Sequence, residues 1–199
     1  PLHAGLQEGR FYSMKRGVVI ETKRLVLPHW QDNSFDRDVF FRLTSDPEIM
    51  RFFPKRLTRE EADLLFDKVI ALVDAHGYGW GAACLKDTGE AVGFTGVAPV
   101  DYFSAAFLPA DEIGWRFVPE VWGKGFATEA AAALLKHART ELAMERIVAF
   151  AVISNFPSIS VMRRIGMNER PDLAFNHPLV PESMPDLRPH VLYEKRFNP

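Results

Sequence analysis

The chain of 199 residues is long enough for one domain with a sizeable core. A formal net charge of −2, with 47% hydrophobic and 25% charged residues, excludes an overall attraction to nucleic acid or to an anionic membrane surface. The longest apolar runs are far shorter than the ~18 residues that span a bilayer. The single cysteine, Cys84, excludes an intrachain disulfide and favours a cytoplasmic location.

The first 17 residues show no clear periodicity, and the sequence begins without Met. We therefore expect an N-terminal extension over residues 1–17, with Met14 as a candidate start, followed by a single domain over residues 18–199. Residues 18–20 and 25–27 are apolar runs that predict either one extended strand or two short ones.

Two helices are predicted next, over residues 32–45 and 58–76. Thr58 and Glu61 have the spacing of a capping box, and Gly77 is a typical stop. The residues expected to face inward from this second helix are Ala62, Leu65, Phe66, Val69 and Val73. The link over residues 51–56 mixes aromatic and cationic side chains, so it either walls a ligand pocket or anchors a loop on the core.

A hairpin is predicted from residues 80–85 and 91–97, with Gly89 in its turn. Cys84 lies on its first strand and is expected to be a buried small apolar residue. Residues 99–110 are apolar without a period. They line an acceptor site, form a partner surface or only pack, and the sequence leaves these three open.

Residues 111–139 are the most informative stretch, because they predict a strand, a glycine-rich turn and then a helix. The strand covers residues 112–117, and the helix begins near Gly125. One side of this helix is apolar, and it carries Ala127, Ala130, Ala131, Leu134, Leu135 and Ala138. The other side carries Glu129, Lys136, Arg139 and Thr140.

A glycine-rich turn that enters a helix is a ready anion site, because the first-turn amides have no intrahelical partner. Residues 123–128 therefore predict a site for a phosphate-bearing ligand, and a turn that serves packing alone is the alternative. The sequence contains no GxxxxGK[ST] motif. Thr128 stands where a dinucleotide GxGxxG fingerprint requires its third glycine.

Residues 147–153 predict a buried central strand. Asn155 then offers an N-cap, Pro157 suits a first helical turn and Gly166 suits a C-cap. Five prolines between residues 168 and 190 forbid long regular elements, so a shaped loop is expected there, before a final strand over residues 191–197.

The segment WGKGFATEA at residues 122–130 resembles the acetyl-CoA pyrophosphate loop of the GNAT acetyltransferase superfamily, [QR]-x-x-G-x-[GA]. Trp122 replaces the usual Gln or Arg, as is common in the branch of ribosomal-protein N-terminal acetyltransferases, which this chain resembles most. Residues 155–167 are similar to a second block of the family, N-x-x-S-x-x-V-x-x-x-x-G-[FM], and residues 22–27 to its T-x-R-L-x-L opening, in which Pro28 replaces the following Arg.

This resemblance implies a mixed α/β fold with a mostly antiparallel sheet of about seven strands and two parallel central strands, 112–117 and 147–153, that diverge. Acetyl-CoA would enter between them, with its pantetheine on the backbone of residues 113–118 and its pyrophosphate on 123–128. The implied cofactor-binding residues are Phe117, Val118, Gly123, Lys124, Gly125, Phe126, Ala127, Thr128 and Asn155.

The resemblance also implies a direct acetyl transfer to a primary amine, which requires no metal and no covalent enzyme intermediate. Glu112, at the start of the strand, is the candidate general base and would act through water; a strand-edge carboxylate in a hydrogen bond is the alternative. Ser158 matches the Ser that the branch uses opposite the departing thiolate, or else only satisfies helix amides. Met162 stands where many members have a Tyr. Asn155 caps its helix, donates to pantetheine, or does both.

Other charged and imidazole groups have weaker signals. His137 is expected to be solvated or satisfied in the core, whereas His177 and His190 flank the proline-rich loop and either reach an acceptor or do not. The N-terminal cations are expected to form a solvated face rather than a site for an acidic substrate or the 3′-phosphate; they are Lys15, Arg16, Lys23, Arg24, Arg51, Lys55, Arg56 and Arg59.

The function expected is thus N-acetyl transfer from acetyl-CoA to a protein N-terminus or a small-molecule amine, by a monomer or a homodimer without a nucleic-acid or membrane partner. Two alternatives stay open. One is a catalytically idle acyl-CoA-binding regulator or partner-binding module, and the other is a dinucleotide-dependent oxidoreductase.

Overall fold

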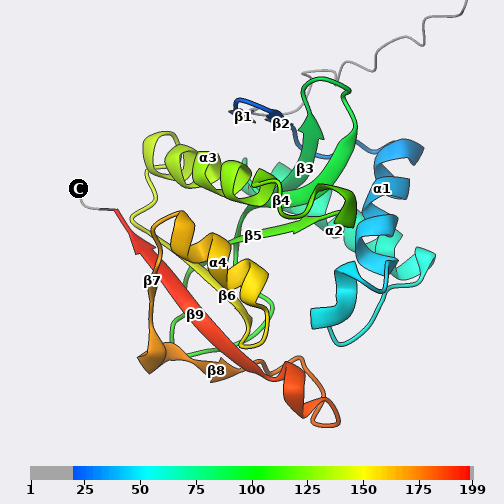
Figure 1. Ribbon diagram of the computed structural model, residues 1–199. Coiled ribbons are helices and arrows are strands. Elements are labelled where there is room, and N and C mark those ends of the chain that lie inside the picture. The colour runs from blue at the N-terminus through cyan, green and yellow to red at the C-terminus, as the bar shows by residue number, and fades with distance from the viewer. Residues whose placement is uncertain (1–19, 198–199) are drawn as a thin grey trace, which may run out of the picture.

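The computed structural model describes residues 20–197 (Figure 1). The predicted extension over residues 1–17, its candidate start at Met14 and the first residues of the first predicted strand therefore lie outside the described residues. Within that range the α-helices are α1 Ser34–Ser45, α2 Arg59–His76, α3 Phe126–Thr140 and α4 Phe156–Arg164. The strands are β1 Ile20–Glu21, β2 Leu25–Leu27, β3 Trp80–Leu85, β4 Ala91–Pro99, β5 Asp111–Phe117, β6 Arg146–Val152, β7 Asn168–Glu169, β8 Phe175–Asn176 and β9 Pro189–Arg196.

The described strands form one nine-stranded sheet in the order β1-β2-β3-β4-β5-β6-β9-β7, with β8 also paired to β9. Every pairing is antiparallel except that of β5 with β6. The mixed α/β class and the mostly antiparallel sheet are therefore confirmed. The sheet exceeds the predicted seven strands because the proline-rich segment adds the two-residue strands β7 and β8 along β9.

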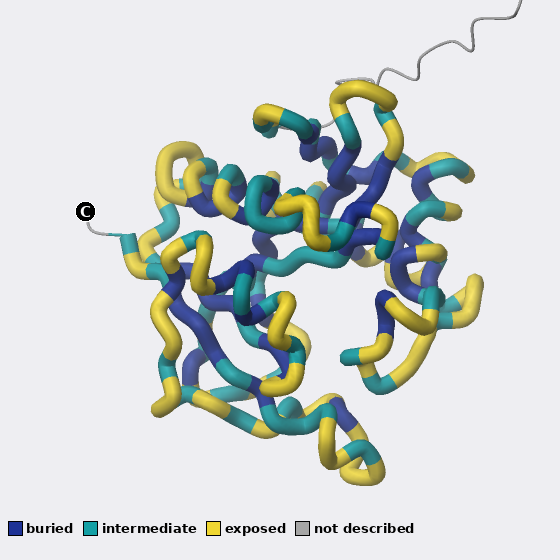
Figure 2. Tube along the Cα trace, viewed as in Figure 1, coloured by how far each residue is buried: buried dark blue, intermediate teal, exposed yellow. Residues whose placement is uncertain are grey.

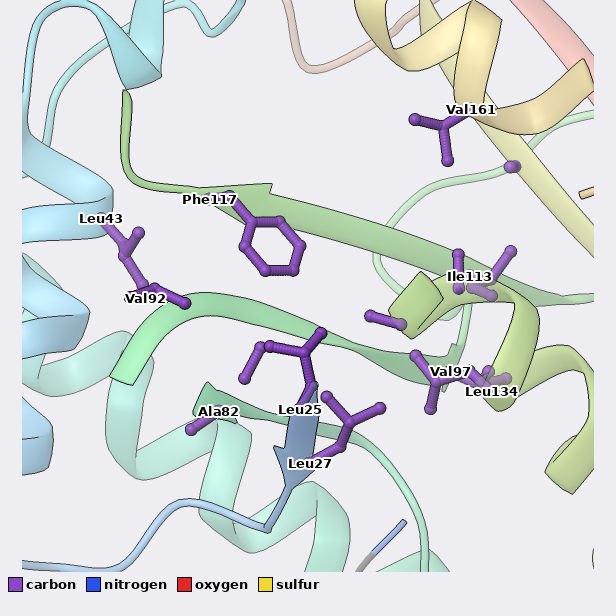
Figure 3. Packing of buried hydrophobic residues seen from close by; sticks show 14 of the residues in the cluster. Leu25, Leu27, Leu43, Ala82, Val92, Val97, Ile113, Phe117, Leu134 and Val161 are labelled. Carbon is purple, nitrogen blue, oxygen red and sulfur yellow. The ribbon is translucent and has the colours of Figure 1, made fainter. Parts of the chain in front are cut away.

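The helices cover the two faces of the sheet, with α3 and α4 on one face and α1 and α2 on the other (Figure 1). On the α3 face, Ile113 and Val97 lie near Leu134, and on the α1 face Val92 lies beside Leu43 (Figure 3). Figure 2 shows the buried residues concentrated in the central strands. None of the helices in residues 20–197 is both long and apolar enough to cross a membrane.

Local signals determine the ends of α2 as predicted. The Thr58 side chain accepts the backbone N–H of Glu61, and the Glu61 carboxylate accepts the backbone N–H of Thr58 at 3.0 Å. Gly77 ends the helix with a left-handed φ of +76°. Ala62, Phe66 and Val69 are buried, but the inward placement of Leu65 was wrong, since its side chain is 39% exposed.

The carboxylate of Glu194 on β9 holds the C-terminal half of the sheet together. It accepts hydrogen bonds from Arg146 on β6, from Arg170 at 2.7 Å and from Arg196 at 3.0 Å. Arg146 also donates to the carbonyl groups of Phe107 and Pro109, at 2.8 and 3.2 Å. The loop that connects β4 to β5 is thereby attached to β6 and β9.

Candidate active site

The parallel strands β5 and β6 pair over only two residue pairs before they diverge. Asp111 lies opposite Ile147 and Glu112 opposite Val148, and no pair follows although β5 continues for five more residues and β6 for four. We call the gap beyond these pairs the wedge. Although β5 is a central strand, five of its seven residues are only half-buried (Figure 2). The predicted divergence of the central parallel strands is thus confirmed.

The wedge exposes hydrogen-bonding groups of the β5 backbone. The N–H of Val118 donates to Val92 on β4 at 3.0 Å, so the backbone groups of the even-numbered residues bond to β4. By alternation the backbone groups of Trp115 and Phe117 point toward β6, which has already diverged. The C=O of Phe117 accepts the indole N–H of Trp122 at 2.7 Å. The N–H and C=O of Trp115 and the N–H of Phe117 are therefore the groups that an extended ligand in the wedge could pair with.

The start of α3 differs from the starts of the other described α-helices. Side chains cap α1, α2 and α4, namely Asn33, Thr58 and Asn155. The N-cap of α3 is Gly125, with φ +80° and no side-chain cap. The first bond of the helix runs from the N–H of Glu129 to the C=O of Gly125 at 3.0 Å. The amides of residues 126–128 thus have no intrahelical acceptor, an arrangement that suits the binding of an anion.

Gly123 also has a left-handed backbone, with φ +72°, and a Cβ built there meets no atom within 4 Å. The loop over residues 123–128 is thus open to a ligand on this side, and its conformation requires glycine at two positions. Lys124 lies between these glycines with an exposed side chain. Phe126, Ala127 and Thr128 are half-buried, so only part of each side chain is accessible.

Arg24, the residue directly before β2, binds to this loop and stabilises it. Its Nε donates to Glu129 Oε2 at 2.6 Å, its Nη1 donates to the C=O of Lys124 at 2.9 Å, and its guanidinium lies 4.1 Å from the centre of the Phe126 ring. Glu129 Oε1 accepts from the hydroxyl of Thr22 at 2.6 Å and from the N–H of Arg24 at 2.7 Å. Although burial opposes it, these bonds hold the pKa of Glu129 below its ordinary value.

One expectation is corrected by this contact, because Arg24 is bound to Glu129 and to the loop and does not belong to a freely solvated face. The other described cations expected on that face are exposed, as predicted; they are Lys23, Arg51, Lys55, Arg56 and Arg59. Lys55 and Arg59 also form ion pairs with helix carboxylates. The motif T-x-R-L contains Arg24, but its partner Glu129 is 105 residues away, so periodicity could not reveal the pair.

Glu112 lies at the inner end of the wedge, where a tyrosine hydroxyl donates to its carboxylate. The hydroxyl of Tyr102 lies 3.0 Å from both Oε1 and Oε2 of Glu112. Burial raises the pKa of Glu112 to about 7, while the hydrogen bond from Tyr102 opposes that rise. A carboxyl group with a pKa near neutrality can exchange protons at physiological pH. The sequence did not single out Tyr102, because its segment has no period.

Arg116 lies on the same side of β5 as Glu112, four residues further along the strand. Its Nη1 donates to the C=O of Leu43 at 3.2 Å, and its guanidinium lies 4.2 Å from the centre of the Phe53 ring. Burial lowers the pKa of Arg116 to about 10, so the group stays charged at pH 7. Phe53 belongs to the link over residues 51–56, which therefore reaches β5 through this cation–π contact.

The second predicted site block forms the first turn of α4. The side-chain Oδ1 of Asn155 accepts the backbone N–H of Ser158 at 3.3 Å, so the cap is formed and the amide nitrogen of Asn155 is not used by it. Ser158 is half-buried, whereas Met162 is 2% exposed in the main core. Asn155 and Ser158 follow β6, so they lie on the side of the wedge opposite the α3 loop.

The remaining candidates have structural surroundings of their own. Cys84 is 1% exposed in the main core, as predicted. His177 and His190 lie with ring centres 4.9 Å apart. Burial, together with His190, lowers the pKa of His177 to about 4, and burial also lowers the pKa of His190. His137 lines a cavity of about 40 Å³ with His29, Tyr78 and Leu142.

A larger cavity, of about 360 Å³, also lies outside the wedge. It opens between α3, the end of α4 and the end of β9, and its lining includes Lys136, Arg139, Ile165, Lys195 and Phe197. Neither cavity involves β5, Glu112 or the start of α3.

Comparison with known proteins identifies the family. A family model described as an acetyltransferase (GNAT) domain matches residues 24–168, which include the loop, the wedge and α4. The chain is 31% identical over 148 residues to an uncharacterized N-acetyltransferase, YnaD, of Bacillus subtilis strain 168, covering 74% of this chain and 81% of that relative. This chain belongs to the GNAT acetyltransferase family.

Solved structures agree with this assignment. A GNAT-family acetyltransferase from Bacillus anthracis superposes with a TM-score of 0.72 and 25% identity, over 90% of this chain and 98% of that one. The ribosomal L7/L12 α-N-protein acetyltransferase RimL, solved in complex with coenzyme A, superposes with a TM-score of 0.69 over 90% of this chain and 98% of that one. Its identity of 16% indicates a shared fold alone.

Proposed function

We propose that this chain transfers an acetyl group from acetyl-CoA directly to a primary amine. The observation that carries the proposal is the wedge: it has open backbone groups along β5, uncapped amides at the start of α3 at its outer end, and a carboxyl group near neutrality at its inner end. A phosphate-bearing thioester would lie along β5 with its reactive carbon near Glu112.

The residues that would hold coenzyme A form two groups. The amides of residues 126–128, with the open turns at Gly123 and Gly125, suit the pyrophosphate because the helix start carries partial positive charge. The backbone of Trp115 and Phe117 suits the amide groups of pantetheine, and the amide nitrogen of Asn155 lies across the wedge from them. Val118 would contribute packing, since its N–H already bonds to Val92.

Glu112 would act as the general base, directly or through one water. It removes a proton from the ammonium form of the acceptor, and the resulting amine nitrogen attacks the thioester carbonyl carbon. The new C–N bond forms and the nitrogen loses its second proton to water. The C–S bond breaks, and the hydroxyl of Ser158 gives its proton to the departing thiolate and regains one from water. The products are an amide and the free thiol of coenzyme A, and Glu112 returns its proton to solvent. Holding both reactants in the wedge contributes further, because it removes the entropy cost of their encounter.

The acceptor class has two candidates within the family. The likeness of the sequence motifs to the ribosomal-protein branch supports a protein N-terminus. A small-molecule amine fits the same chemistry. A cytoplasmic location accords with the single buried cysteine.

The experiment measures thiol release from acetyl-CoA in the presence of a panel of primary amines, together with calorimetric binding of coenzyme A. We expect binding of coenzyme A and amine-dependent thiol release, with Glu112→Gln reducing kcat by roughly 10²–10⁴-fold at unchanged affinity for coenzyme A. Ser158→Ala should reduce kcat less, because water can protonate a thiolate.

Other outcomes identify the alternatives. If coenzyme A binds but the wild type, Glu112→Gln and Ser158→Ala proteins are equally inactive with every amine, the chain is an acyl-CoA-binding regulator. If NAD and not coenzyme A raises the midpoint of thermal unfolding, the chain is a dinucleotide-dependent oxidoreductase and not an acetyltransferase.

A further inference from the structure

Six aromatic rings gather on the sheet face opposite α3 and α4, beside Glu112. They are contributed by the loop between β4 and β5, by β6, by β8 and the residues after it, and by β9. We call them the ring cluster; its members are Phe103, Phe107, Phe150, Phe175, His177 and His190. Neighbouring ring centres within it lie 4.8 to 6.3 Å apart.

The ring cluster is connected to the candidate base. Tyr102, whose hydroxyl holds the carboxylate of Glu112, has its ring centre 5.0 Å from that of Phe103. Glu112 pairs with Val148 on β6, and Phe150 follows two residues later on the same face, where β6 separates from β5. The cluster therefore borders the inner end of the wedge, where the reacting carbonyl would lie.

The ring cluster is not a sealed minor core. Phe107 and His190 are buried, but Phe103, Phe150, Phe175 and His177 are half-buried. Large apolar side chains nearby are also exposed. Tyr102 is 46% exposed, and Leu179, which donates its N–H to His177 Nδ1 at 3.3 Å, is 56% exposed. An apolar surface thus remains open next to Glu112, and covering it with an apolar group would be favourable.

The six side chains of the ring cluster themselves supply no carboxylate. His177 Nδ1 accepts the N–H of Leu179, which suits a neutral ring, and burial lowers the pKa of His190 although its contact with the C=O of Arg188 opposes that change. The carboxylates near the hydroxyl of Tyr102 are Glu112 and the exposed Asp101, while Asp111 beside Glu112 already accepts a hydrogen bond from Tyr78. A polyamine carries several positive charges and requires several carboxylates, so this part of the described chain suits it poorly.

We propose that the acceptor is a primary amine borne on an uncharged apolar group of about the size of an aromatic ring, and not a polyamine. This inference rests on the proposed acetyl transfer and specifies its substrate class. The apolar group packs on Phe103, Phe150 and His177, and the amine nitrogen faces Glu112. One ammonium proton goes to Glu112, and the nitrogen bonds to the acetyl carbon and loses a second proton to water. The C–S bond breaks, and the thiolate takes up a proton through Ser158, which gives the amide and the thiol.

The first test compares kcat/KM for phenethylamine, propylamine and spermidine at saturating acetyl-CoA. We expect phenethylamine to exceed propylamine by about tenfold or more, because it buries a ring where propylamine buries a short chain. It should exceed spermidine by a similar factor. Spermidine or propylamine equal to or better than phenethylamine would overturn the substrate class while leaving acetyl transfer intact. No thiol release with any amine would reject the acetyl transfer itself and this inference with it.

The second test uses variants that change one ring. Phe103→Ala should lower kcat/KM for phenethylamine about tenfold, with little change for propylamine or in the KM for acetyl-CoA. The matched control is Phe41→Ala, since Phe41 on α1 is also half-buried and lies outside the ring cluster. If Phe103→Ala does not fold, Phe103→Leu keeps the bulk and removes the ring, and a loss of about threefold is expected. Equal losses for both amines, or equal effects of the two alanine variants, would contradict the proposal.

Discussion

The guanidinium of Arg24 and the carboxylate of Glu129 meet at 2.6 Å and connect the residue before β2 to the first turn of α3. Without its partner, a carboxylate in this turn would repel a bound pyrophosphate from the same helix start. With Arg24 beside it the pair is neutral, and the second guanidinium arm fixes the C=O of Lys124. The pair therefore stabilises the loop in the form that leaves its amides open.

We predict that Arg24→Ala weakens the binding of coenzyme A by roughly fivefold, equivalent to about 1 kcal/mol. The expected loss of affinity is modest because the Arg24 side chain is 40% exposed and water partly screens its ion pair. KM for acetyl-CoA should rise while kcat changes little, since Arg24 does not reach Glu112. Calorimetry and steady-state kinetics measure both quantities. The control is Lys23→Ala at the exposed neighbouring position, and an equal effect of the two variants would refute the positioning role of Arg24.

Gly123 and Gly89 have similar backbones, with φ of +72° and +70°, but only Gly123 lies in the loop before α3. Replacing either with Ala places a Cβ in the left-handed region and should lower stability by about 1 kcal/mol. Only Gly123→Ala should also raise the Kd for coenzyme A, because Gly89 lies in the turn between β3 and β4. Thermal unfolding and calorimetry separate the two effects. Unchanged affinity in Gly123→Ala would show that a close approach of phosphate to this glycine is not needed.

The pH dependence of kcat/KM should follow the pKa of Glu112, about 7. A base works when deprotonated, so the rate should rise about tenfold per pH unit below 7 and level off above it. The hydrogen bond from Tyr102 lowers this pKa, so Tyr102→Phe should move the midpoint to higher pH. Tyr78→Phe is the control, because Tyr78 donates to the adjacent Asp111 at 2.8 Å instead. A midpoint in Tyr102→Phe that stays fixed or moves to lower pH argues against this assignment.

Glu194 should contribute to stability through its arginines. Burial alone would raise its pKa, but hydrogen bonds from Arg196, Arg146 and Arg170 lower it to about 2. A depressed carboxylate pKa contributes stability above the unfolded value near 4.5, and this is lost as the pH falls toward 2. Glu194→Gln should therefore lower the free energy of unfolding by about 2–4 kcal/mol at pH 7, and by progressively less below pH 4.5.

Urea denaturation at several pH values measures this difference. The control is Glu182→Gln, since Glu182 is 91% exposed and pairs with Arg188 at 3.4 Å, and its effect should stay within about 0.5 kcal/mol. If Glu194→Gln lowers the free energy of unfolding by the same amount at every pH, Glu194 stabilises the fold through its shape and not through its charge.

Elements with strong local signals were predictable from the sequence. The capping box at Thr58 and the stop at Gly77 define α2, and glycine at the cap together with an alanine-rich stripe defines α3. Local signals were less reliable where two apolar stripes compete. On α2 both Leu65 and Phe66 fit a helical period, and the packing of the Phe66 ring against Trp30 and Phe40 decides which of them is buried.

The candidate site divides in the same way. The loop before α3, Glu112 and the first turn of α4 are each contained in one short segment, so their motifs could be recognised in the sequence. Arg24 and Tyr102 act through partners on other elements, and only the folded chain brings them together. The ring cluster is a further case, since its members come from four separate segments and none has a motif of its own.

The two-residue pairing of β5 with β6 divides the sheet into unequal parts, β1–β5 and β6–β9. Among residues 20–197 the strand pairing that joins these parts lies only near Glu112, so the junction is weak in the direction that opens the wedge. A ligand that bonds to Trp115 on one side and to Asn155 on the other would supply cross-links that the polypeptide lacks. A ligand bound in the wedge should then suppress local separation of β5 from β6. Amide hydrogen exchange in both strands should therefore slow together when the ligand binds.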